Sequence, residues 1–212
     1  MTGKIKLVHS GGNSVSLAVP TSNPSSSEVE FKLPQSDGSA NEFLKTDGSG
    51  NLSFAAESAG ITMADQWRIT TAYTNSGTNF ITANWERVDN SIFGQLGTGM
   101  TESSGVFTFP STGIYFVNFF TTHRQVNGTS MYNGIQFHTT TDNSSYTMLA
   151  NAYDSVAATA YFAVTALSHI VDITNTSTHK IKFAHVAEYS SNIAGDTNET
   201  MTGVTFIRLG DT

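Results

Sequence analysis

The chain has 212 residues, only 13% of which are charged, and its net charge at pH 7 is −7. Its ten lysines and arginines are too few for the clustered basic surface that nucleic acid requires, so we expect no nucleic-acid partner. The sequence contains no cysteine, which excludes disulfides, cysteine nucleophiles and zinc–cysteine sites. No apolar run approaches the ~20 residues of a membrane span, and we therefore expect no membrane insertion.

Residues 1–60 contain three of the four prolines and few large apolar side chains. Segments 13–23 and 27–37 match one another at an offset of 14 residues. Each has the alternating pattern of a strand that ends in proline and a turn. The matched apolar positions are Val15 with Val29, Leu17 with Phe31, and Val19 with Leu33.

A third pair of strands is predicted at residues 42–46 and 51–54, around the turn Asp47-Gly48-Ser49-Gly50. Short hairpins of this kind bury little by themselves and gain stability by stacking on other chains. Residues 1–60 are therefore predicted to form an extended β-repeat stalk, with a hinge at 55–64 and a domain boundary near Gly60. A flexible N-terminal tail is the alternative. The residues assigned to attachment are Val15, Leu17, Val29, Phe31, Leu33, Phe43 and Leu44.

Residues 61–212 contain short apolar segments that are separated by turn signals and show no sustained helical period. About ten strands in ~150 residues are typical of a sandwich or jelly roll. The predicted fold is therefore an all-β jelly-roll sandwich that follows a hairpin and repeat stalk. The predicted strands are 66–73, 80–88, 91–96, 105–109, 113–123, 130–140, 146–151, 159–173, 179–188 and 201–209.

The segment 105–120 is the most apolar part of this region. Residues 110–113 have the proline and glycine of a turn, and a strand rich in aromatic and β-branched residues follows. Both faces of that strand are largely apolar, so another sheet or another copy of the chain must cover the second face. The alternation separates Tyr115, Val117 and Phe119 from Phe116, Asn118 and Phe120.

The pattern Phe107-x5-Gly113-x-Tyr115-x-Val117-x-Phe119 resembles the second half of the signature of the complement-one-q globular heads. That family has an aromatic residue where this chain has Val117. It shares its jelly roll with the tumour necrosis factor ligands, and the resemblance implies a tight homotrimer with aromatic residues at its threefold axis. The residues assigned to the trimer interface and core are Tyr115, Phe116, Val117, Phe119, Phe120 and Phe206.

Segments 31–38 and 43–54 resemble parts of structural proteins from marine tailed bacteriophages. This second resemblance implies a location in the virion, as a short fibre, tail knob or capsid appendage that residues 1–60 attach to other virion proteins.

Polar residues of the head are candidates for contact with a host-surface glycan or protein, because rigid sandwiches carry recognition on their loops and tyrosine makes adaptable contacts. The alternative is that these loops connect strands or contact neighbouring virion proteins. The residues assigned to receptor contact are Asn127, Tyr132, Asn143, Tyr146, Tyr153 and Tyr189.

Two sets of residues are candidates for chemistry, but neither has the spacing of a known site. The histidines do not repeat a metal-ligand spacing, and the scattered carboxylates need not approach to the ~5–9.5 Å that a glycosidase requires. We therefore expect no metal, no cofactor and no catalytic residue. The candidates are His123, His138, His169 and His185 for metal or titration, and Glu86, Asp89 and Glu102 for acid–base catalysis.

The leading hypothesis is a non-enzymatic virion protein with a trimeric head on an attachment stalk. The alternatives are a soluble complement-like or lectin-like binding module and a glycan-degrading tail enzyme. The missing signal peptide and cysteines count against the binding module, and the missing acid cluster counts against the enzyme.

Overall fold

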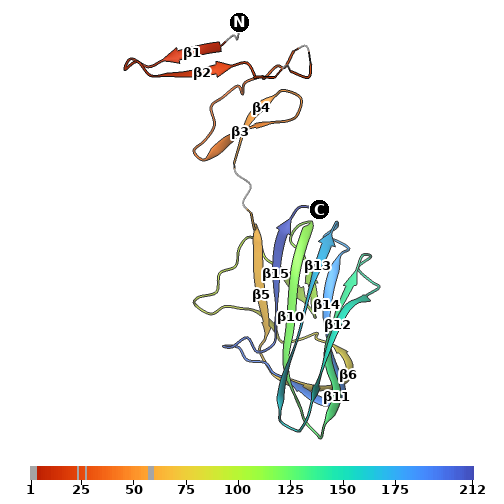
Figure 1. The fold of residues 1–212 in the computed structure, drawn as a ribbon. Coiled ribbons are helices and arrows are strands. Elements are labelled where there is room, and N and C mark those ends of the chain that lie inside the picture. The colour runs from red at the N-terminus through yellow and green to blue at the C-terminus, as the bar shows by residue number, and fades with distance from the viewer. Residues whose placement is uncertain (1–3, 23, 27, 57–59) are drawn as a thin grey trace. The chain divides into compact units, whose positions relative to one another are not determined.

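The computed structural model describes residues 4–22, 24–26, 28–56 and 60–212. The chain divides into two compact units, Met1–Ser58 and Ala59–Thr212. Throughout the described residues the secondary structure is β-strand and turn, so none of them forms a helix that could span a membrane (Figure 1). Asn23, Ser27 and the hinge residues 57–59 lie outside the described residues. The predicted all-β class is confirmed.

The N-terminal unit consists of two hairpins. Strand β1 (Lys4–Val8) pairs with β2 (Ser14–Ala18), and β3 (Glu42–Thr46) pairs with β4 (Leu52–Ala56). The second hairpin is the one predicted around residues 47–50. Its turn is closed by the Asp47 carboxylate, which accepts hydrogen bonds from the backbone N–H groups of Ser49 and Asn51.

The predicted strand at 27–37 is wrong within the described part of that segment. Residues 28–37 contain a single bridge, in which Lys32 pairs with Asn51. Lys32 donates its N–H to the Gly50 carbonyl and accepts from the Leu52 N–H, so the segment is anchored at one point beside the β3–β4 turn. The alternating residues of this segment therefore have no neighbouring strand with which to form a ladder.

The C-terminal unit, the head, contains eleven strands in one hydrogen-bonded sheet that folds over into a sandwich. One layer runs β13-β10-β15-β5-β7, and the other is built on β12-β11-β14, with β9 and β6 along the second edge of β14. The predicted jelly roll is confirmed. The strands are β5 (Met63–Ile69), β6 (Tyr73–Phe80), β7 (Trp85–Arg87), β8 (Thr101–Ser103), β9 (Val106–Thr108), β10 (Gly113–Gln125), β11 (Ser130–Thr140), β12 (Thr147–Val156), β13 (Phe162–Ile173), β14 (Lys180–Ile193) and β15 (Gly203–Gly210).

Two predicted features of the head are wrong. Residues 91–96 form no strand, because Leu96 bridges Ala64 while Ile92 is left 92% exposed without a neighbouring strand. The interval between the predicted strands 66–73 and 80–88, which includes Asn75-Ser76-Gly77, lies inside β6. The ladder between β6 and β14 shifts register there, so the irregularity is absorbed without ending the strand.

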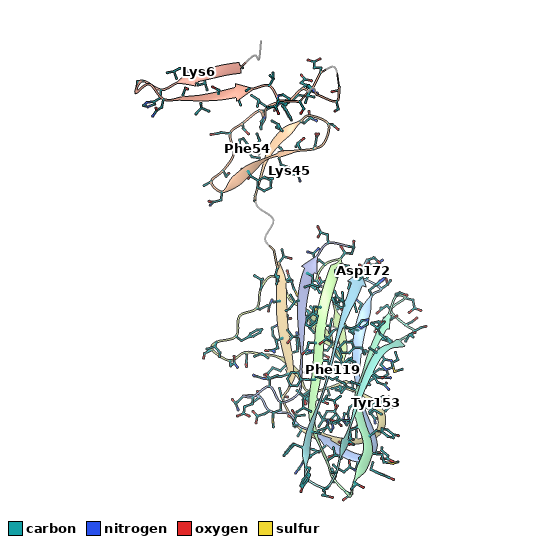
Figure 2. The ribbon with its side chains drawn as sticks, viewed as in Figure 1. Lys6, Lys45, Phe54, Phe119, Tyr153 and Asp172 are labelled. Atoms are coloured by element: carbon teal, nitrogen blue, oxygen red, sulfur yellow. The ribbon has the colours of Figure 1, made fainter. Side chains whose placement is uncertain are left out.

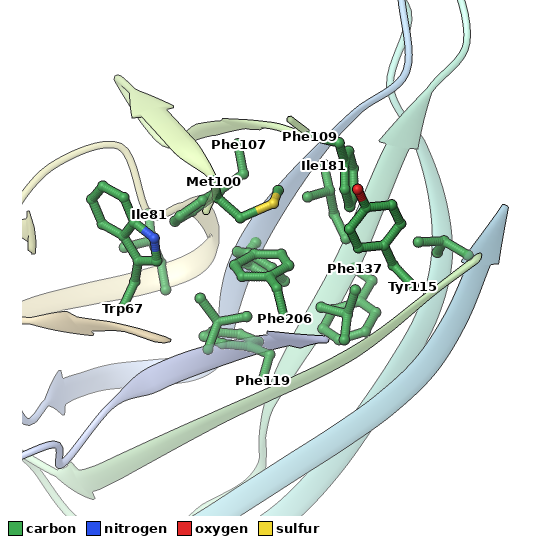
Figure 3. Packing of buried hydrophobic residues seen from close by; sticks show 14 of the residues in the cluster. Trp67, Ile81, Met100, Phe107, Phe109, Tyr115, Phe119, Phe137, Ile181 and Phe206 are labelled. Carbon is green, nitrogen blue, oxygen red and sulfur yellow. The ribbon is translucent and has the colours of Figure 1, made fainter. Parts of the chain in front are cut away.

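Aromatic side chains form the core between the two layers (Figure 3). Phe107 lies at its centre and is fully buried. Its ring centroid is 5.1–5.6 Å from those of four other rings, and edge-to-face and tilted packing predominate. The four rings belong to Trp67, Trp85, Phe183 and Phe206.

Candidate interaction surfaces

Strand β10 alternates between a buried face and a partly exposed face along its whole length. Tyr115, Val117 and Phe119 are fully buried in the core. Phe116 and Phe120 point to the other side and remain partly exposed. Among the six residues assigned to interface and core, Phe206 is also fully buried, so the two outward phenylalanines alone reach the surface of the sheet.

The neighbouring strands extend this outward face. Phe116 lies between Ile170 of β13 and Ile207 of β15 in the register of the sheet. Phe120 lies between Ala166 and Gly203. Ile170 is 58% exposed. We call Phe116, Phe120, Phe162, Val164, Ile170 and Ile207 the outer sheet face.

The sandwich is open between β12 and β13. Within the described residues, β12 pairs with β11 and β13 pairs with β10, and no ladder joins β12 to β13. The Asp154 carboxylate of β12 crosses this opening. It lies 3.0 Å from Nε2 of His123 on β10 and accepts a 2.8 Å hydrogen bond from the Thr165 hydroxyl of β13. Asp154 therefore links the two layers where backbone pairing does not.

A second histidine lies beside this link. The ring of His185 is fully buried, with its centroid 5.3 Å from that of His123. Its Nδ1 lies 2.8 Å from Oδ1 of Asn75, within hydrogen-bond distance. Burial, and secondarily the proximity of His123, lowers the pKa of His185 to about 3. The ring is therefore neutral at physiological pH.

Hydrogen bonds also decide the protonation of Asp154. Burial would raise the pKa of this carboxyl, but hydrogen bonds from His123 and Thr165 hold it below its ordinary value. The Asp154 carboxylate is therefore charged, whereas the buried imidazole of His185 is neutral.

The four histidines predicted as candidates do not form one cluster. His123 and His185 lie together, whereas His138 packs edge-on against Phe80 with ring centroids 4.8 Å apart. His169 lines a separate cavity of about 230 Å³ between β11 and β13. Across the described chain, no group of three or more histidine, aspartate and glutamate side chains could hold a metal ion.

The three candidate acids have structural partners. Glu86 and Asp89 both pair with the buried guanidinium of Arg68, at 2.9 Å and 2.5 Å. Glu102 accepts a 2.6 Å hydrogen bond from the Gly105 N–H. Glu86 on β7 and Asp89 after it therefore neutralise a buried arginine, and Glu102 on β8 holds the turn before β9.

The six residues assigned to receptor contact lie at two ends of the head. We call the end at which β5 begins the entry end; Met63, Gly113 and Ile173 lie there. Asn143 and Tyr146 also lie at the entry end. The Asn143 N–H donates to the Thr178 carbonyl in the loop that follows β13. Figure 2 shows Asp172 towards the entry end and Tyr153 further towards the far end. The four toward the far end are Asn127, Tyr132, Tyr153 and Tyr189.

Tyr153 and Tyr189 lie outside the predicted strands, in segments expected to be loops, and that placement is wrong, whereas Tyr132 lies within the predicted strand 130–140. Tyr132, Tyr153 and Tyr189 lie on β11, β12 and β14 and are each about half exposed. The rings of Tyr132 and Tyr153 pack edge-to-face with centroids 6.1 Å apart. Tyr153 stays within β12 because its backbone pairs with Gly134 of β11, which local polarity in the sequence did not indicate. Tyr132 and Tyr189 lie at register shifts of their ladders, which the strands continue past.

All seven residues assigned to attachment are exposed, from 48% for Phe43 to 78% for Leu33. Val15 and Leu17 lie on β2, whereas Val29, Phe31 and Leu33 lie on the extended segment beside β4. Among the described large apolar side chains of this unit, Leu52 alone is half-buried. The described part of this unit therefore has an apolar surface and no core.

No family model and no curated protein matches the sequence. Two similar solved structures are murine APRIL at pH 5.0 and Eiger TNF from S. frugiperda. The first is 11% identical, with 69% of this chain and 98% of that chain covered and a TM-score of 0.52. The second is 12% identical, with 73% and 96% covered and a TM-score of 0.56.

PRD1 vertex protein P5 also matches, at 14% identity and with 72% of this chain and 100% of that chain covered. Its TM-score of 0.46 is too low to carry an argument. The likeness of residues 1–60 to phage proteins thus remains a prediction. The other matches, together with the strand topology, show that the head has the jelly-roll fold of the tumour necrosis factor ligands.

Proposed function

We propose that the protein is a non-enzymatic virion structural protein, a short fibre, knob or capsid appendage. It assembles as a homotrimer of jelly-roll heads, and its N-terminal unit attaches it to other virion proteins. The observation that carries this proposal is the outer sheet face, where apolar side chains of three adjacent strands lie open to solvent.

An apolar sheet face of this kind marks a protein–protein contact, because a soluble monomer rarely exposes a contiguous apolar patch. Phe116, Ile170 and Ile207 are direct neighbours across the sheet, so they form one patch and not scattered residues. Threefold symmetry comes from the resemblance to complement-one-q heads. A closed ring of three heads covers the face in every copy.

The N-terminal unit supports the attachment role. Its exposed apolar side chains can be covered only by contacts outside the unit, and residues 28–33 carry three of them in an extended strip. Attachment to a neighbouring virion protein would bury that strip and place the protein in the virion.

The far end of the head is the expected contact with a host glycan or protein. Tyr132 and Tyr153 form a half-exposed aromatic pair there, with Tyr189 on the neighbouring β14. Tyrosines held on strands lose little conformational freedom on binding, which favours their use in recognition. Asn143 and Tyr146, at the entry end, are expected to contact neighbouring subunits instead.

The mass of the full chain in solution tests the trimer. At micromolar concentration, light scattering should give three times the 22.7-kDa chain mass. Ile170→Asp should reduce the mass to that of one chain while circular dichroism stays unchanged, because a buried unpaired carboxylate is costly at an interface. The matched control is Ile92→Asp, which changes a more exposed isoleucine on a loop and should remain trimeric.

A monomeric wild-type chain would refute the trimer, and a trimeric Ile170→Asp variant would show that the outer sheet face is not the interface. Removal of residues 1–60 tests attachment separately. The truncated head should no longer join particles that lack the protein, whereas the full chain should. If the truncated head still joined them, the roles of the two units would be reversed.

A further inference from the structure

One face of the β1–β2 hairpin consists of aliphatic side chains. In its register, Ile5 lies opposite Leu17 and Leu7 lies opposite Val15. Because side chains alternate along a strand, these four share one face, and they are 66–72% exposed. We call them the aliphatic hairpin face. The opposite face is mixed: it carries Lys6, Ser14 and Ser16 together with Val8 and Ala18. Figure 2 labels Lys6.

Nothing in the described part of the N-terminal unit covers this face. The hairpin has two strands, and no third strand of the described residues pairs with it. A two-stranded hairpin is marginally stable in water unless its apolar side packs on something. The alternation at Ile5, Leu7, Val15 and Leu17 is therefore expected to serve a contact with another chain.

We propose that the aliphatic hairpin face packs against the same face of the sister chains, so that three hairpins close around an axis. This inference rests on the proposed homotrimer and adds a second contact to it. It assigns Val15 and Leu17 to contact between copies, and it leaves residues 28–33 and the β3–β4 hairpin for attachment.

Charge selects this face for contact between identical copies. Identical faces bring like groups together, and like charges across a sheet contact are destabilising. The aliphatic hairpin face carries no charged group, whereas the opposite face carries Lys6. Three lysine-bearing faces would repel one another at an axis, so the aliphatic side turns inward and Lys6 remains in solvent.

The small size of the face favours a sister chain as its occupant. Independent protein partners bury about 20–30 residues on each side, and four aliphatic side chains are far fewer. A face this small can bind its partner when the partner is already held nearby. In the trimer each hairpin is covalently joined to a head, so the sister hairpins are present at an effective concentration of the order of millimolar.

Cysteine cross-linking of the full chain tests this directly, because the sequence has no cysteine and any disulfide must form between introduced residues. Leu7→Cys replaces a side chain on the aliphatic hairpin face, and Lys6→Cys is the matched control on the same strand. Under a mild oxidant, Leu7→Cys should place up to about two-thirds of the chains in covalent dimers, because one disulfide joins two of three copies. Lys6→Cys should yield few.

A second pair on β2, Val15→Cys with Ser16→Cys as control, covers the case in which the geometry at residue 7 does not suit a disulfide. Cross-linking at Leu7 or Val15 but not at the controls supports the proposal. No cross-linking at either aliphatic position, or equal cross-linking on both faces, overturns it.

The mass of the same variants separates this result from the proposed trimer. If the chain is trimeric but forms no cross-links, the hairpin contact alone is refuted, and another protein covers the aliphatic hairpin face. A monomeric chain without cross-links sinks both proposals.

Discussion

The head and the N-terminal unit use the same sequence pattern with opposite results. In β10, alternation places Tyr115 and Phe119 in a closed core. In β2, the same alternation leaves Val15 and Leu17 more than 70% exposed. The difference is a second layer, which the head possesses and the two hairpins lack. Alternation therefore decides which side chains share a face, and the number of packed layers decides whether that face is buried.

The largest expected effect is on the core of the head. Phe107→Ala should lower the free energy of unfolding by about 3–5 kcal/mol, because it removes a fully buried ring that contacts four others. Urea denaturation of the full chain measures this. A loss below about 1 kcal/mol would mean that the head does not depend on this aromatic core.

Acid should destabilise the head through His185. Its pKa of about 3 in the folded chain lies below the ordinary value of 6.5, so unfolding takes up a proton at any pH between them. Stability is complete above pH 6.5 and falls by about 1.4 kcal/mol per pH unit below it, or about 2 kcal/mol at pH 5. Melting curves from pH 7 to 5 should show this loss.

His185→Gln is the control for the acid effect. It keeps a polar side chain but cannot titrate, so its stability should change less between pH 7 and 5 than that of the wild type. Equal losses in the two proteins would show that another group is responsible. Loss of the charge on Asp154 adds to the effect only below its ordinary pKa of 3.8.

The smallest expected effect is on the exposed apolar strip of the N-terminal unit. Phe31→Ala removes a ring of the same size as Phe107, but its side chain is 62% exposed. Its effect on the unfolding free energy of the unattached chain should stay within about 0.5 kcal/mol. A loss near that of Phe107→Ala would contradict the contrast between the two units.

Long, strongly patterned segments were predicted well from the sequence. Predicted strands at 113–123 and 130–140 correspond to β10 and β11, and the hairpin at 42–54 corresponds to β3 and β4. In these elements, alternation, turn residues and β-propensity all agree. Where these three signals agree, the local sequence is sufficient to predict the strand.

Predictions failed where a neighbouring strand decided the outcome. Segment 28–33 alternates as well as β2 does, but a single bridge at Lys32 gives it no ladder. Tyr153 lies in a polar segment, but pairing with Gly134 keeps it within β12. The link from Asp154 to His123 and Thr165 joins three strands, and no spacing in the sequence indicates it.

The sequence by itself determined the all-β class, the strand at 113–123 and the separation of its side chains into two faces, because these follow from turn chemistry and a two-residue period. Only the tertiary structure decided which face of β10 is the core, that Phe116 joins Ile170 and Ile207 on the outside, and that the aliphatic hairpin face lacks a cover. The reason is that burial depends on which distant strands pack together, and that information does not reside in any one segment.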